Sequence, residues 1–318
     1  MDFTKFNFWE DTILGTPDDD KYEVNGGANT VDMTQGGDDI LIVNSWVGTI
    51  LMGNGDDDVF MRNFAGSNFV DLGNGNNLFN SEEGSFIGEI VGGRQTDVVT
   101  LGIGGANKVS LGGGGDVFAS SGFVNELNTG NGADVVAFVD GAGANNITLG
   151  AGMDVLNADG FVSFVDAGRN SDGVSLDAGG GTVQLGNGHD SFSAGGWIGQ
   201  VFGGRGNDTF ELNGGGNAFG GRNNDTFIHG EGSDNFFGEN GRDTFIFNAD
   251  TAGAYDTIDG GNGRDTLNIE IFGDPGLKET VDDELAGWQS GDPIFISALN
   301  LQVANVEVIN VDLDPPII

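Results

Sequence analysis

Aspartate recurs at a nearly fixed interval along this chain, each time at the end of a glycine-rich hexamer and before a short apolar segment. Up to Asp225 the interval is 17 to 20 residues, with Asn77 standing where one aspartate is missing. Such a short period predicts one structural unit stacked on itself, with one carboxylate per unit at the same place on the surface. The thirteen aspartates are Asp39, Asp58, Asp97, Asp116, Asp134, Asp154, Asp172, Asp190, Asp208, Asp225, Asp234, Asp243 and Asp265.

A row of carboxylates repels itself unless cations lie between its members. Calcium prefers hard oxygen ligands, including aspartate oxygens and the backbone carbonyls that a glycine loop exposes. A single aspartate after glycine would be read as an ordinary turn residue. Thirteen in register favour calcium instead, so we expect several Ca²⁺ ions as cofactors and these aspartates as their ligands.

The composition excludes several classes of partner. The chain has 318 residues, 49 acidic and 11 basic side chains, and a formal charge of −38 at pH 7. This charge argues against nucleic acid, and no apolar run approaches the ~20 residues of a membrane span, so we expect no membrane insertion. The chain has 60 glycines and no cysteine, but 24 phenylalanines supply apolar surface for a core. Bound metal can then replace disulfides in stabilising the fold.

A second set of glycine turns lies between the aspartate loops, so each repeat reads loop, short strand, loop, short strand. This pattern predicts an all-β fold, a parallel β-solenoid of about eleven turns or more with a small C-terminal cap. The residue two positions after each aspartate, such as Phe60, Phe79 or Phe118, should point inward and form the core.

Two further columns of residues should lie on the surface. Every second turn carries an aromatic residue, which either caps the core at one edge or forms a contact surface: Trp46, Phe86, Phe123, Phe161 and Trp197. The residue directly after each aspartate should point outward, and in the N-terminal half it is apolar: Ile40, Val59, Leu78, Val98, Val117, Val135 and Val155. This stripe reflects either the β-propensity of valine or an interface for self-association or a surface ligand.

The loops Gly203–Asp208, Gly220–Asp225 and Gly260–Asp265 resemble the GGxGxDxUx nonapeptide of RTX proteins, which are secreted bacterial proteins with a calcium-loaded parallel β-roll. The resemblance implies calcium ions held between successive loops on one edge. Asp208 and Asp225 would share ions, and Asp243 would continue the same edge. The carbonyl ligands implied are those of Gly203, Arg205, Gly220 and Arg222. Asp234 lies on the other edge, where we expect no close partner one turn away.

The repeat types suggest a division of the chain. We expect an N-terminal cap over 1–25, a solenoid of 19-residue repeats over 26–200, and a nonapeptide β-roll over 201–265. Residues 266–318 should form a C-terminal cap, with a short helix over 279–289 and an end that resembles a type I secretion signal.

The function expected from these features is that of a secreted, extracellular or cell-surface calcium-binding solenoid, which folds on calcium outside the cell and serves a structural or self-assembling role. One alternative is an adhesin that binds a carbohydrate or a surface through its aromatic residues. Another is the secretion and folding module of an RTX enzyme. The chain has two histidines, His189 and His229, and neither a Ser/His/Asp arrangement nor an HExxH motif, so we expect no enzyme activity.

Overall fold

The computed structural model describes residues 3–82, 84–249 and 254–314. The chain is an all-β parallel β-solenoid of about 15 turns with one short α-helix near the C-terminus, which confirms the expected fold class. Internal contacts divide it into two units, Met1–Phe164 and Val165–Ile318. This division does not coincide with the change of repeat type near residue 200.

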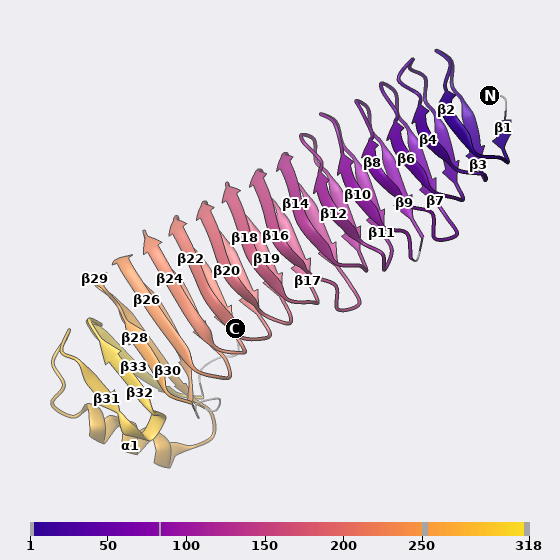
Figure 1. Cartoon of the computed structure of the whole chain (residues 1–318). Helices are drawn as coiled ribbons and strands as arrows, with labels where there is room; N and C mark the ends of the chain where they lie inside the picture. Colours follow the sequence, from indigo (N-terminus) through magenta and orange to yellow (C-terminus); the bar gives the residue numbers. More distant parts are fainter. Residues whose placement is uncertain (1–2, 83, 250–253, 315–318) are drawn as a thin grey trace. The chain divides into compact units, whose positions relative to one another are not determined.

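In unit 1 each turn contributes one strand to each of two sheets, and the strands lie side by side from indigo to magenta in Figure 1. The first sheet contains β1 (Phe3–Phe6), β3 (Lys21–Val24), β5 (Ile40–Val43), β7 (Asp58–Met61), β9 (Leu78–Ser81), β11 (Val98–Leu101), β13 (Val117–Ser120), β15 (Val135–Phe138) and β17 (Val155–Ala158). The second contains β2 (Glu10–Leu14), β4 (Ala28–Asp32), β6 (Val47–Leu51), β8 (Ser67–Asp71), β10 (Ile87–Val91), β12 (Ala106–Ser110), β14 (Val124–Asn131) and β16 (Ala144–Ala151). The described part of the expected N-terminal cap thus holds strands that pair in parallel with the repeats.

Unit 2 follows the same plan, and β18 (Val162–Arg169) contains the boundary between the units. Its first sheet contains β19 (Gly173–Leu176), β21 (Ser191–Ala194), β23 (Thr209–Leu212), β25 (Thr226–His229), β27 (Thr244–Asn248), β30 (Thr266–Ile271) and β33 (Val308–Leu313). Its second contains β20 (Gly180–Asn187), β22 (Ile198–Arg205), β24 (Gly216–Arg222), β26 (Asp234–Gly241), β28 (Asp256–Asp259), β29 (Asn262–Gly263) and β32 (Leu301–Ala304), with β31 (Ile294–Ile296) antiparallel to β32.

The core follows from the parallel register, which places equivalent residues of successive turns directly above one another at about 4.8 Å. Phe210, Phe227 and Phe245 are therefore neighbours in one buried column. Each successive pair stacks with 4.9 Å between ring centroids and 12° between ring planes. The inward column predicted from the sequence is confirmed, except at Phe60.

The helix α1 (Pro275–Leu285) begins four residues before the expected range. Asp274 caps its N-terminus by accepting a hydrogen bond from the Leu277 N–H at 2.9 Å, and Pro275 suits the first helical position. Within the described residues, no helix has the length and apolar character needed to cross a bilayer. Of the segment expected to act as a secretion signal, residues 315–318 lie outside the described part of the chain.

Candidate metal-binding ladder

A ladder of buried carboxylates runs along one edge of unit 1, where each second-sheet strand turns into the next first-sheet strand. Each member accepts a hydrogen bond through Oδ1 from the backbone N–H of the member one turn before. Asp57 accepts from Asp39 at 2.9 Å, Asp116 from Asp97 at 2.8 Å, and Asp134 from Asp116 at 2.7 Å. These bonds fix the carboxylates in one orientation.

The aspartates of unit 2 form the same arrangement. Asp208 accepts from the Asp190 N–H at 2.9 Å, and Asp225 accepts from the Asp208 N–H at 2.8 Å. Asp243 and Asp265 continue the series at 2.8 Å each. The Asp265 N–H in turn donates to Glu307 Oε2 at 2.7 Å, so a glutamate 42 residues further on ends the ladder. The repeat pattern did not predict this role, because Glu307 lies outside the repeats.

The prediction of Asp58 as a ladder residue is wrong, because Asp57 occupies the ladder position. Asp58 begins β7 and faces outward, directly above Ile40 and below Leu78 in the sheet. The shift by one residue turns Val59 into the core, where it is fully buried. It also places Phe60 on the outer face. Residues 56–58 are all aspartate, so the sequence alone does not show which of them occupies the ladder position. A shift of one residue exchanges the two faces of a strand.

The second carboxylate oxygen of the ladder residues is buried and lacks a hydrogen-bond donor in the described part of the chain. These atoms are the Oδ2 atoms of Asp39, Asp57, Asp116, Asp134, Asp190, Asp208, Asp225, Asp243 and Asp265. A buried carboxylate oxygen without a partner is energetically unfavourable, so a native protein neutralises it with a proton or a cation. In Asp97, by contrast, the Oδ2 atom accepts a hydrogen bond from the Gly93 N–H at 3.0 Å.

Burial governs the acidity of the ladder. It raises the pKa of Asp39 and Asp190 to about 6, although the backbone N–H bond to each acts in the opposite direction. Burial, with a smaller contribution from the neighbouring carboxylates, raises the pKa of Asp116, Asp225 and Asp243 to about 7. Without a bound cation, folding therefore favours the protonated form of these groups.

In some loops the residue five positions before the ladder aspartate is a glycine, and its missing side chain leaves space beside the Oδ2 atom of that aspartate. A Cβ on Gly203 would collide with Asp208 Oδ2 and would lie 2.6 Å from the carbonyl oxygen of Gly220 in the next turn. A Cβ on Gly220 would collide in the same way with Asp225 Oδ2. A carboxylate oxygen and a carbonyl oxygen thus converge at the cradle left by each glycine, and both are calcium ligands.

The same cradle is present at Gly92, Gly238 and Gly260. In other loops a buried side chain stands five residues before the ladder position: Met52, Leu72, Leu111, Leu149 and Leu185. The carbonyl oxygens predicted as ligands at Arg205 and Arg222 accept backbone hydrogen bonds from Gly188 at 2.8 Å and Gly206 at 3.2 Å. A carbonyl oxygen has two lone pairs, so these bonds leave one available.

No protein-family model and no curated protein matches this sequence. The resemblance to RTX proteins therefore rests on the loop residues, and the parallel solenoid with its stacked aspartates agrees with it.

The opposite edge of unit 2 corrects one prediction. Asp234 was expected to lack a partner one turn away, but the Asp234 N–H donates to Asp256 Oδ1 at 2.8 Å. Asp256 follows 22 residues later, outside the usual interval. The pair repeats the ladder geometry on the second edge.

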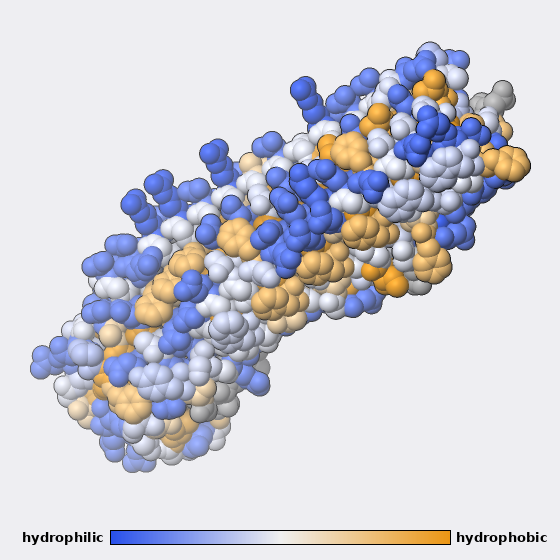
Figure 2. Space-filling view, in the orientation of Figure 1, coloured by the Kyte–Doolittle hydropathy of each residue, from blue (hydrophilic) through white to orange (hydrophobic). Residues whose placement is uncertain are grey.

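The outer stripe of unit 1 lies on the exposed face of the first sheet. Val117, Val135 and Val155 are 40, 45 and 42% exposed, whereas Leu78 and Val98 are half-buried. Asp58 interrupts the stripe where Val59 was expected. On the face seen in Figure 2, hydrophobic residues gather in patches between hydrophilic side chains.

The aromatic residues of alternate turns are all exposed. In unit 1 they are Trp46, Phe86, Phe123 and Phe161, and in unit 2 Trp197, with exposures from 42 to 60%. The ring of Trp46 lies over Gly66, because a Cβ on that glycine would meet the ring at 2.7 Å. One ring face thus covers the backbone of the next turn. With 42% of Trp46 exposed, part of the residue is still accessible to solvent.

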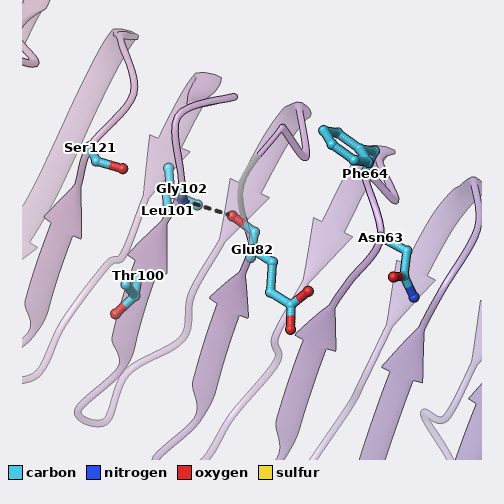
Figure 3. Close-up of a pocket in the computed structure, with 8 residues that line it drawn as sticks. Asn63, Phe64, Glu82, Thr100, Leu101, Gly102 and Ser121 are labelled. Carbon is cyan, nitrogen blue, oxygen red and sulfur yellow. Dashed lines mark hydrogen bonds between the residues drawn. The ribbon is translucent and has the colours of Figure 1, made fainter.

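A surface groove of about 540 Å³ lies beside the same edge of unit 1 (Figure 3). Asn63, Phe64 and Glu82 lie along one part of it, and Thr100 and Ser121 along another. Asn63 and Phe64 have positive φ angles of 54° and 60°, and Phe64 is 77% exposed. Positive φ is uncommon for a bulky residue, so the loop presents this ring at a conformational cost.

Proposed function

We propose that this protein is a calcium-binding β-solenoid that folds when calcium fills its aspartate ladder. The observation that carries the proposal is the row of buried Oδ2 atoms that have no hydrogen-bond donor within the part of the chain that the structure describes. Cations between the turns would neutralise these oxygens, and the resemblance to RTX loops favours calcium over other cations.

The residues at the glycine cradles are the strongest candidates for holding the ions. Asp208, Asp225 and Asp243 would supply charge, and the carbonyl of Gly220 would supply a neutral oxygen. Bound calcium would neutralise the carboxylates and link successive turns. The binding free energy would then add to the stability of the fold, since the unfolded chain lacks these sites.

A matched pair of variants tests this assignment. Asp225→Asn should lower calcium affinity at its loop at least ~10-fold, because one charge and one oxygen ligand are lost beside an open cradle. Asp116→Asn should change the tight sites little, because Leu111 stands at the cradle position in that loop. Both aspartates make the same ladder hydrogen bonds, and Asn77 shows that asparagine fits the ladder. Isothermal titration calorimetry measures both affinities, and equal losses would contradict the assignment.

The biological setting of this function is also a proposal. We infer that the chain leaves the cell unfolded by type I secretion, at the low free calcium of the cytosol, and folds in the calcium-rich exterior. A structural role, without enzyme activity, suits a chain composed almost entirely of repeats.

We further propose that the outer stripe of unit 1 mediates self-association. Replacing Val98, Val117 and Val135 by threonine keeps β-branched side chains in the strands but removes apolar surface. Sedimentation velocity in calcium should show a shift from assemblies to single chains, while circular dichroism stays unchanged. Assembly that persists in the triple variant contradicts a role for this stripe.

A second candidate function is adhesion to a carbohydrate or another surface. The exposed rings of Trp46, Phe86 and Trp197 favour it, since flat aromatic faces suit the apolar faces of sugars. The groove also places polar side chains such as Asn63 and Glu82 near the exposed ring of Phe64.

A further inference from the structure

A second cluster of ligand-type side chains lies in unit 2, on the edge opposite the ladder. It contains His229 at the end of β25, Asp234 at the start of β26 and Asp256 at the start of β28. One ligand atom from each residue lies within 4.8 Å of those from the other two. The cluster combines an imidazole with two carboxylates, so its donor set differs from the oxygens of the ladder.

The distances suit ligands around a common ion. His229 Nε2 lies 3.4 Å from Asp256 Oδ2 and 3.7 Å from Asp234 Oδ2. Both exceed the ~2.7–2.9 Å of a charge-assisted hydrogen bond. Ligand atoms bound to a tetrahedral zinc ion at 2.0–2.1 Å lie about 3.3 Å apart, close to the observed spacing.

The cluster is buried and fixed in place. The side chains of His229, Asp234 and Asp256 are only 1 to 2% exposed. The Asp256 carboxylate is held by the Asp234 N–H, and the His229 ring stacks on Phe247 with 4.1 Å between centroids. Both oxygens of Asp234 lack a hydrogen-bond donor among the described residues. Asp234 is therefore a buried carboxylate aimed into the cluster without a hydrogen bond of normal geometry, and a weak interaction with the Gly230 backbone favours its charged form.

The charges favour a dication over a proton. An imidazolium between two carboxylates would leave one net negative charge buried, whereas a neutral imidazole and a dication make the cluster neutral. Uncompensated buried charge is strongly unfavourable. Imidazole nitrogen is typical of zinc-type ions, whereas calcium takes oxygen ligands.

We propose that His229, Asp234 and Asp256 bind one zinc-type divalent ion, separate from the calcium ions of the ladder. The ion joins two consecutive turns, because Asp234 and Asp256 begin strands that pair with each other. β28 also pairs with β32, so the ion links the last repeats to the C-terminal segment. Asp234 can supply two oxygens, which with His229 and Asp256 makes four donors in a buried site, and this suits an ion with a structural role.

The first experiment uses the unaltered full chain. The protein is folded in millimolar calcium, stripped of other metals and titrated with zinc, while imidazole ¹H–¹⁵N NMR spectra are recorded. The chain has only two histidines, so two sets of ring signals are expected. At one zinc per chain the His229 signals should shift and the His189 signals should not. Cobalt should give the visible absorption of a single tetrahedral site.

Variants provide the matched comparison. His229→Gln should lower zinc affinity at least ~100-fold, since loss of a ligand exceeds the loss of an outer-shell partner. His189→Asn should leave the zinc affinity unchanged, because His189 is exposed and lies outside the cluster. Asparagine suits this position, since Asn207 one turn later accepts a hydrogen bond from the Asn224 N–H just as His189 accepts one from the Asn207 N–H. Asp256→Asn, with its β-content checked by circular dichroism, gives a second test if His229→Gln does not fold.

Three results would overturn the proposal. They are the absence of stoichiometric zinc binding by the folded chain, a zinc-induced shift of His189 alone, and equal zinc affinity in the folded His229→Gln or Asp256→Asn variant. His229 signals that stay unchanged in excess zinc would show that this imidazole is not a ligand. None of these readouts depends on which ion fills the ladder.

Discussion

Removal of calcium is expected to unfold most of this protein, and restoring millimolar calcium should refold it. The physical reason is the number of buried carboxylates whose second oxygen has no hydrogen-bond donor among the described residues. If three calcium sites are filled at a free calcium concentration 100 times their dissociation constants, binding adds ~8 kcal/mol to the free energy of unfolding. That sum is comparable to the entire stability of a typical domain, about 5–15 kcal/mol. Far-ultraviolet circular dichroism in EGTA and in calcium measures the change.

Magnesium at the same ionic strength is the control, because it screens the net charge of −38 equally but fits flexible oxygen sites poorly. Equal β-content in EGTA and in calcium would contradict the proposed role of calcium in folding. Refolding by magnesium would show that charge screening alone suffices.

The second large effect is a pH dependence that reverses sign when calcium is added. In the metal-free protein, burial raises the pKa of Asp39 and Asp190 to about 6 and of Asp116, Asp225 and Asp243 to about 7. The unfolded chain has ordinary aspartate pKa values near ~3.9. A pKa raised by folding means that the folded chain binds more protons, so these groups favour the fold at acid pH.

Their contribution is complete below about pH 4 and is lost as the pH rises through 6 to 7. Metal-free protein should therefore be largely unfolded at pH 8 and regain β-content at pH 5, as measured by far-ultraviolet circular dichroism. In calcium the trend should be opposite between these values, because protons compete with calcium for the same carboxylates.

Metal should be removed with a chelating resin, since EGTA binds calcium weakly at acid pH. Because burial raises the pKa of the ladder aspartates to about 6 or 7, their protonation is expected to give a transition between pH 6 and 7. The Asp225→Asn variant should weaken the pH dependence in both conditions. The same direction of pH dependence with and without calcium would contradict the assignment of the ladder as the binding site.

The local repeat was enough to predict the solenoid, its inward column and its carboxylate row. In a parallel stack, each turn repeats the environment of the one before, so a residue such as Phe118 or Asp225 can be placed by its interval alone. Glycine before the aspartate could likewise be recognised as part of a loop. What the sequence did not reveal is that Gly203 leaves space beside an orphaned oxygen, whereas Leu111 stands at that position elsewhere.

Tertiary structure alone decided the positions where the interval fails. Asp56, Asp57 and Asp58 have identical side chains, so any of them could occupy the ladder position. Asp57 occupies it because Val59 is packed in the core. Asp256 reaches Asp234 after a turn of irregular length, and Glu307 reaches Asp265 from outside the repeats. Contacts of this kind depend on where the chain returns after an irregular loop, which a periodic pattern does not encode. The sequence therefore determined the ladder, and the fold determined its ends, its register and the histidine cluster opposite it.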